Sequence, residues 1–211
     1  MTLHFQQAPV ASTDALNAFL PRIAGRPSVA ARAPAINAAA NLAARRLPGA
    51  AFPVPQAPEP ITAPVHVLGL QDIVQKHDIK ATPVRLWSHL LHAEGEPAPT
   101  AIAEFDAGTE AFQALSEGEE ISQLGRRIRA VETAQASLEM DYDLALVRVP
   151  ALSLTALWLK GRAGAPDEII PNDSPQSPLT PGKSYSPQDF YAALTPVADQ
   201  ILKETDPLKG G

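Results

Sequence analysis

Two histidines three residues apart, His89 and His92, are the metal-ligand candidates of this chain, with Glu94 and Glu96 just beyond them. On a helix, residues at i and i+3 share a face and could hold one zinc ion, whereas on a strand they lie on opposite faces. An HExxH pattern is absent. We therefore expect surface or structural histidines here, and no bound cofactor.

The other residues that could do chemistry have simpler structural explanations. Glu104 and Asp106 would share one face of a strand, where paired carboxylates can catalyse proton transfer or bind a cation. A solvated outer face is the expected arrangement for them. Ser88 lies next to His89, but neighbours in sequence seldom reach the geometry of a nucleophile and its base. The chain has no Cys, P-loop, GxGxxG or GxSxG motif, so no catalytic residue is predicted.

Charge is unevenly distributed along the 211 residues. Residues 1–60 carry five arginines against Asp14 and Glu59, a net charge of +3, and the remainder carries -9. An acidic main part repels phosphate, so we do not expect nucleic acid as a partner. No apolar run approaches about 18 residues, and the start lacks the pattern of a secretory signal. We expect no membrane span and a cytoplasmic location.

Proline content divides the chain into three parts. Ten of the 22 prolines lie in residues 1–64, which predicts an Ala/Pro-rich, weakly structured N-terminal arm and linker with short helices. An α+β domain is expected over residues 65–205, followed by a flexible tail over 206–211. A short apolar stripe in the arm supplies the partner-binding candidates, although such stripes dock on the chain's own domain more often than on a partner: Leu16, Phe19, Leu20 and Ile23.

The segment Tyr142–Lys160 locates the folded core. It consists of two apolar runs separated by Val149-Pro150-Ala151, and apolar residues on both sides indicate strands covered on both faces. Helices are expected over Glu119–Ser137, with a capping box from Ser116, and over Pro187–Lys203. Shorter strands are expected over Val65–Leu68, Thr100–Asp106 and Ile169–Ile170.

The segment Val84–His92 fits two structures. A 3.6-residue periodicity places four polar residues on one helical face: Arg85, Ser88, His89 and His92. The turn at Glu94-Gly95-Glu96-Pro97 instead favours a hairpin that ends at Asp106. In either case, the predicted fold is α+β, with a small, mostly antiparallel sheet packed against two main helices.

Four segments, taken in order, resemble a group of bacterial hypothetical proteins to which no activity is assigned. They are Pro83-Val-Arg-Leu-Trp87, Thr100–Phe105, Val149-Pro-Ala-Leu152 with Ala156-Leu-Trp-Leu159, and Tyr185-Ser-Pro-Gln-Asp-Phe190. The resemblance covers about residues 65–200 and implies no catalytic residue. It favours a strand over Val84–His92.

A non-enzymatic protein-interaction or assembly module is the leading functional hypothesis. The arm and the Pro-rich loop in Gly161–Ser186 are features through which a module engages another protein or a second copy of itself. One alternative is a small metal-assisted hydrolase built on His89, His92, Glu104 or Asp106. Another is a small-ligand-binding domain with Trp87 and Trp158 lining a pocket, although tryptophans more often belong to a core.

Overall fold

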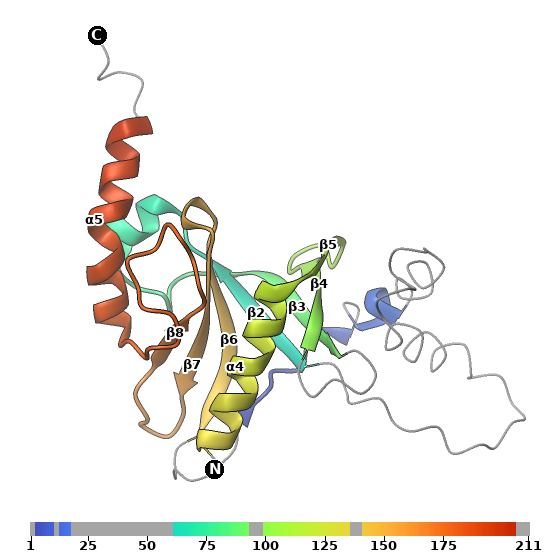
Figure 1. The fold of residues 1–211 in the computed structure, drawn as a ribbon. Helices are drawn as coiled ribbons and strands as arrows, with labels where there is room; N and C mark the ends of the chain where they lie inside the picture. Colours follow the sequence, from blue (N-terminus) through green and yellow to red (C-terminus); the bar gives the residue numbers. More distant parts are fainter. Residues whose placement is uncertain (1–2, 11–12, 18–60, 93–98, 136–140, 206–211) are drawn as a thin grey trace, which may run out of the picture. The chain divides into compact units, whose positions relative to one another are not determined.

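The fold is α+β and contains one mixed sheet of eight strands (Figure 1). The computed structural model describes residues 3–10, 13–17, 61–92, 99–135 and 141–205. The strand order is β5-β4-β3-β2-β6-β7-β8, and β1 also pairs with β6. The predicted fold class is therefore confirmed, but the sheet is larger than the small one expected.

The elements have the following bounds, in chain order. They are β1 (Leu3–His4), β2 (Ile61–Val67), the π-helical turn η1 (Asp72–Lys76), β3 (Val84–His92), β4 (Pro99–Asp106), β5 (Phe112–Glu117), α4 (Glu119–Gln135), β6 (Tyr142–Val149), the 3-10 turn η2 (Pro150–Leu152), β7 (Leu154–Gly161), β8 (Glu168–Pro171) and α5 (Pro187–Thr205). The chain forms two compact units. The first contains Met1–Gln6, Pro64–Arg85 and Ala130–Gly211, and the second contains Gln7–Ala63 and Leu86–Arg129.

Strands β6 and β7 are the centre of the first unit, as Tyr142–Lys160 predicts. They pair antiparallel along their whole length, from Tyr142↔Gly161 to Val149↔Leu154. Pro150 lies in η2 between them, where its missing N–H removes no ladder bond. Both faces are buried, because Leu144 and Leu146 on one side and Ala145 and Val147 on the other are 0% exposed.

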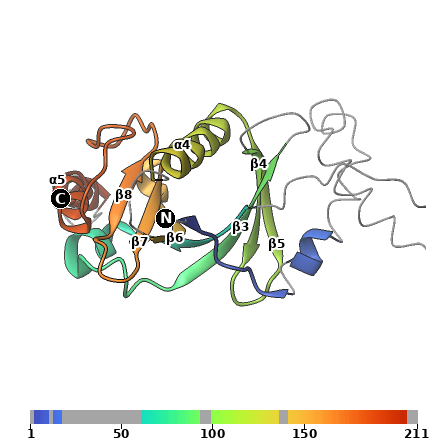
Figure 2. The same ribbon diagram turned by 90° about the horizontal axis from the view of Figure 1, so that it is seen from below.

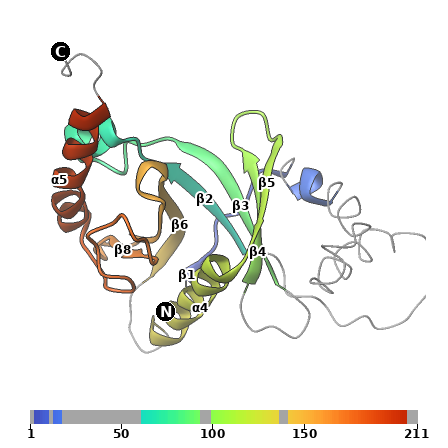
Figure 3. The ribbon, with the colours of Figure 1, turned by 45° about the horizontal axis from the view of Figure 1, so that its top comes forward.

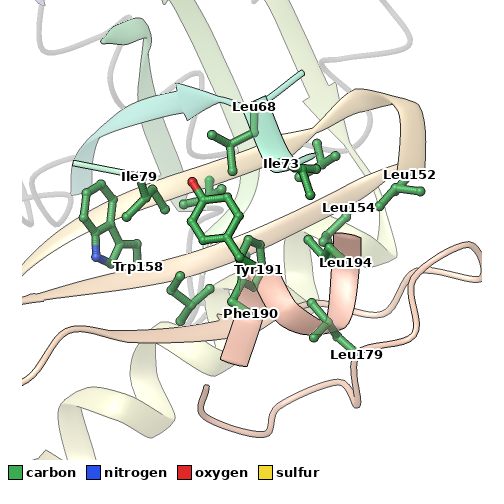
Figure 4. Close-up of a cluster of buried hydrophobic side chains, with 14 of the residues drawn as sticks. Leu68, Ile73, Ile79, Leu152, Leu154, Trp158, Leu179, Phe190, Tyr191 and Leu194 are labelled. Atoms are coloured by element: carbon green, nitrogen blue, oxygen red, sulfur yellow. The ribbon is translucent and has the colours of Figure 1, made fainter. Parts of the chain in front are cut away.

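Helix α5 covers one face of these strands (Figure 2). Its apolar stripe places Phe190, Tyr191 and Leu194 against Trp158 and Leu154 of β7 (Figure 4). Burial of each large apolar side chain contributes about 1.5–3 kcal/mol, so this cluster is the main stabilising contact of the unit. The helix begins at a cap in which Ser186 Oγ accepts a hydrogen bond from the Asp189 N–H at 3.1 Å.

The Pro-rich segment after β8 is folded back on the unit. The Ile169 N–H donates to the Tyr185 carbonyl at 2.8 Å, and the Tyr185 N–H donates to the Ile169 carbonyl at 2.9 Å. Ser174 Oγ donates to the Leu152 carbonyl at 2.6 Å, and Leu179 is buried. The segment thus satisfies backbone groups on the outer edge of β8, and it is less available to a partner than the sequence suggested.

The second unit contains β3, β4 and β5, which lie side by side (Figure 3). Helix α4 approaches β4 closely at Gly125, where a Cβ atom would lie 2.7 Å from the Pro99 carbonyl oxygen. Residues on both faces of the β3–β4 pair are buried, among them Leu90 and Ile102 on one face and Phe105 on the other. The strand suggested by the resemblance for Val84–His92 is therefore correct, and the helix suggested by periodicity is not.

Several finer expectations need correction. Ser116 lies within β5, a strand that was not predicted, so it does not cap α4. The expected domain start at residue 65 falls inside β2, which begins at Ile61. The first residues of the expected arm also belong to the sheet, because Leu3–His4 pairs with β6. Residues 18–60 and the expected tail, 206–211, lie outside the described residues.

Candidate functional site

The two metal-ligand candidates, His89 and His92, lie on strand β3. Residues three apart on a strand point to opposite faces, so the two histidines cannot share a metal ion as they could on a helix. His89 of β3 is 0% exposed, and its ring centroid lies 5.2 Å from that of Phe105 in an edge-to-face contact. Burial lowers the pKa of His89 from 6.5 to about 4. The imidazole is therefore neutral at pH 7 and packs as part of the core. The side chain of His92 lies outside the described residues.

Ser88 and Glu104 form a buried polar pair across β3 and β4. They are direct ladder partners, and Ser88 Oγ donates to Glu104 Oε1 at 3.2 Å. The expected solvated face for Glu104 is wrong, since Glu104 is only 4% exposed. Adjacent residues on a strand point to opposite faces, so Ser88 and His89 do not form a nucleophile–base pair. Asp106 is the last residue of β4, and its Oδ1 accepts hydrogen bonds from the Gly108 and Thr109 N–H groups of the following turn.

A polar cluster that the sequence reasoning missed surrounds Trp158 in the first unit. Asp167 accepts a hydrogen bond from the Trp158 indole Nε1–H at 3.2 Å and another from the Gly161 N–H at 3.0 Å. Its Oδ2 atom lies 3.1 Å from Lys80 Nζ, and its side chain is 7% exposed. Lys160 Nζ lies 4.5 Å from the Trp158 ring centroid. These groups close one end of the apolar core around the indole.

His66 of β2 contacts the same indole at 5.0 Å between ring centroids. Its Nδ1 donates to the Thr82 carbonyl oxygen at 2.7 Å, which leaves Nε2 as the acceptor. Among the residues that the structure describes, none forms a hydrogen bond with that buried Nε2 atom. Burial lowers the pKa of His66, and the hydrogen bond to Thr82 opposes the shift. Burial also lowers the pKa of Lys160, and the carboxylates of Asp143 and Asp167 oppose that shift.

The contacts of this cluster join separate segments of the chain around the indole. Trp158 is 0% exposed, as expected of a core tryptophan. Asp167 gives its carboxylate to an indole, a backbone amide and an ammonium group, so its acceptor sites are used. Within residues 3–10, 13–17, 61–92, 99–135 and 141–205, no three His, Asp or Glu side chains are grouped to hold a metal ion. Sequence reasoning missed the cluster because its members come from four separate segments.

Of the four partner-binding candidates, the structure describes only Leu16. Leu16 is 2% exposed, so its side chain is covered within the chain. Phe19, Leu20 and Ile23 lie outside the described residues, and their role stays a prediction.

Comparisons with protein-family models, curated proteins and solved structures found no match to this chain. Among the described residues, no helix has the length and apolar character needed to cross a membrane.

We predict that Asp167→Ala destabilises the protein by about 2–4 kcal/mol, because the N–H of a buried indole and a half-buried backbone N–H lose their acceptor. Urea unfolding followed by tryptophan fluorescence measures this change. Lys80→Met is the matched control, because it removes the exposed partner of the same carboxylate. Lys80 is 68% exposed, and its pair with Asp167 contributes less than about 1 kcal/mol. Equal losses in the two variants would contradict the assignment.

We also predict that acid destabilises the fold through His89. Below pH 6.5 the unfolded chain binds a proton at this position, whereas the folded chain does not until about pH 4. Stability should therefore fall as the pH drops from 6.5 to 4, by up to about 3 kcal/mol from this group. Urea midpoints across this range should show a smaller pH slope in His89→Phe. Leu90→Ala, a substitution at a buried position of the same strand, is the control. It should lower stability at every pH without changing the dependence of stability on pH. If His89→Phe leaves that pH dependence unchanged, the prediction is wrong.

Proposed function

We propose that this chain is a non-enzymatic protein-interaction or assembly module whose N-terminal arm (residues 1–64) makes the partner contact. The observation that carries the proposal is how the folded unit holds this arm. Leu3–His4 pairs with β6 at Tyr142–Asp143, and β2 pairs with the same strand at Leu146–Arg148. The strands that flank residues 5–60 in the sequence therefore pair with one and the same strand.

The charge of residues 1–60 supports the same proposal. Five arginines give residues 1–60 a positive charge, while the remainder of the chain is acidic. A basic segment between two paired strands can bind an acidic surface of a partner through electrostatic attraction. The other Pro-rich segment, Gly161–Ser186, gives the proposal less support, because hydrogen bonds tie it to β8 and η2.

The packing of His89, Glu104 and Trp158 gives less support to the two alternatives, a metal-assisted hydrolase and a small-ligand-binding domain. His89 is a buried edge-to-face partner of Phe105, and Glu104 is paired with Ser88. Trp158 is enclosed in the core, with its indole N–H donated to Asp167. A cytoplasmic location and a bacterial origin stay predictions from the sequence.

The proposal predicts that affinity capture with the full chain recovers a specific partner, or the chain itself, and that the contact depends on the sequence of residues 18–60. The informative variant shuffles residues 18–60, which preserves length, composition and charge while leaving β1 and β2 in place. Specific binding should be lost in this variant, and reconstitution with the purified partner should reproduce the loss.

A second variant tests whether the partner contact depends on the positive charge of the arm. Replacing the five arginines with Gln (Arg22, Arg26, Arg32, Arg45 and Arg46) should weaken a charge-driven contact, and added salt should weaken the same contact in the unmodified chain. The proposal fails if the full chain captures no specific partner and does not self-associate. It also fails if the shuffled variant binds as well as the natural sequence.

A further inference from the structure

We propose that Lys160 of β7 is a nucleophilic amine that binds a small aldehyde covalently, as a protonated imine. This inference is independent of the proposed partner contact. It concerns the cluster of polar groups around the Trp158 indole, and every group that the argument uses belongs to the first unit.

The ammonium group of Lys160 contacts an aromatic ring. Lys160 is half-buried, and its Nζ atom lies 4.5 Å from the Trp158 ring centroid. Among the residues that the structure describes, none forms a hydrogen bond or an ion pair with this Nζ atom. A half-buried amine in such a place has lost part of its hydration, which favours the neutral, nucleophilic form.

The two carboxylates that act on Lys160 are each paired with another cation. Asp143 is the ladder partner of Lys160 on β6, and its Oδ1 atom lies 3.3 Å from a guanidinium nitrogen of Arg162. Asp167 Oδ2 lies 3.1 Å from Lys80 Nζ. Both carboxylates are therefore partly neutralised before they act on Lys160.

The pKa of Lys160 shows the net effect of these surroundings. Burial lowers this pKa, and the positive charge of Lys80 acts in the same direction, while Asp143 and Asp167 oppose the shift. Each unit by which the pKa of a lysine falls raises its neutral fraction at pH 7 about tenfold. A larger fraction of Lys160 is therefore neutral than of a fully hydrated lysine.

His66 supplies a proton acceptor in the same cluster. Its ring contacts the same indole, and no described residue forms a hydrogen bond with its buried Nε2 atom. Burial lowers the pKa of His66, and the charge of Lys160 acts in the same direction, so the imidazole is neutral at pH 7. The electrostatic effect of Lys160 on His66 shows that the two side chains are close enough to influence each other's protonation.

The charges of the cluster select the type of product. The neutral amine attacks the carbonyl carbon and forms a C–N bond, and a proton moves from nitrogen to oxygen to give a carbinolamine. Uptake of one proton and loss of water then give the protonated imine. This product keeps a positive charge at the indole and near Asp143 and Asp167, as the ammonium group does. The same carboxylates would oppose a carbamate formed with CO₂, because a carbamate is negatively charged.

Propanal with sodium cyanoborohydride tests the proposal, because the reductant converts the imine into a stable propylamine. The full chain is labelled at pH 7, and peptide mass spectrometry follows each lysine. Lys160 should be labelled several-fold faster than Lys183, the matched control, which is exposed and lies 5.0 Å from the Tyr185 ring centroid. Lys160→Arg should remove the fast phase from the mass of the intact chain, and Lys183→Arg should leave it. In urea the two lysines should be labelled at similar rates.

Lys80→Met tests whether the cluster activates the amine. Loss of the Lys80 charge raises the pKa of Lys160, so labelling of Lys160 should slow while that of Lys183 is unchanged. The proposal is overturned if Lys160 in the folded chain is labelled no faster than Lys183, or if its advantage persists in urea. It is also overturned if Lys80→Met leaves the rate at Lys160 unchanged.

Discussion

The first unit depends on strand β6, which is paired along both edges and buried on both faces. Its neighbours on one edge are β2 and β1, and β7 occupies the other edge. A strand in this position can expose neither its backbone nor its side chains, so every residue type is constrained. Arg148 is the one charged residue besides Asp143 in YDLALVRV, and both lie at half-buried positions. In this unit β1, β2 and β7 pair with β6, and β8 pairs with β7.

Closing the ends of this core requires polar groups, and Trp158 shows how they are arranged. The indole is the largest fully buried side chain, and its N–H needs an acceptor. Asp167 provides the acceptor from the β7–β8 connection, while His66 packs against the ring and Lys160 lies over it. Such a cluster resembles a reactive site in composition. Its contacts join four segments of the chain around one aromatic ring.

The sequence predicts the elements best where apolar periodicity is strong. Helices α4 and α5 end within two residues of their predicted bounds, and β6, β7 and β8 lie where expected. Prediction failed where tertiary contacts decide: Val84–His92 has helical periodicity, but β4 pairs with it as a strand. Glu104 looked solvated because its cross-strand partner Ser88 is 16 residues away. The pairing of β1 with β6 joins residues far apart in the chain, so no local pattern could reveal it.

Native-state hydrogen exchange of the β6 amides tests most directly the claim that this strand is the centre of the fold. The amides of Leu144–Val147 should exchange slowest in the first unit, with a protection free energy equal to that of global unfolding. Those of β1 and the last turn of α5 should exchange much faster. If the β6 amides exchange through local opening, at rates similar to those of β1, the central role of β6 is contradicted.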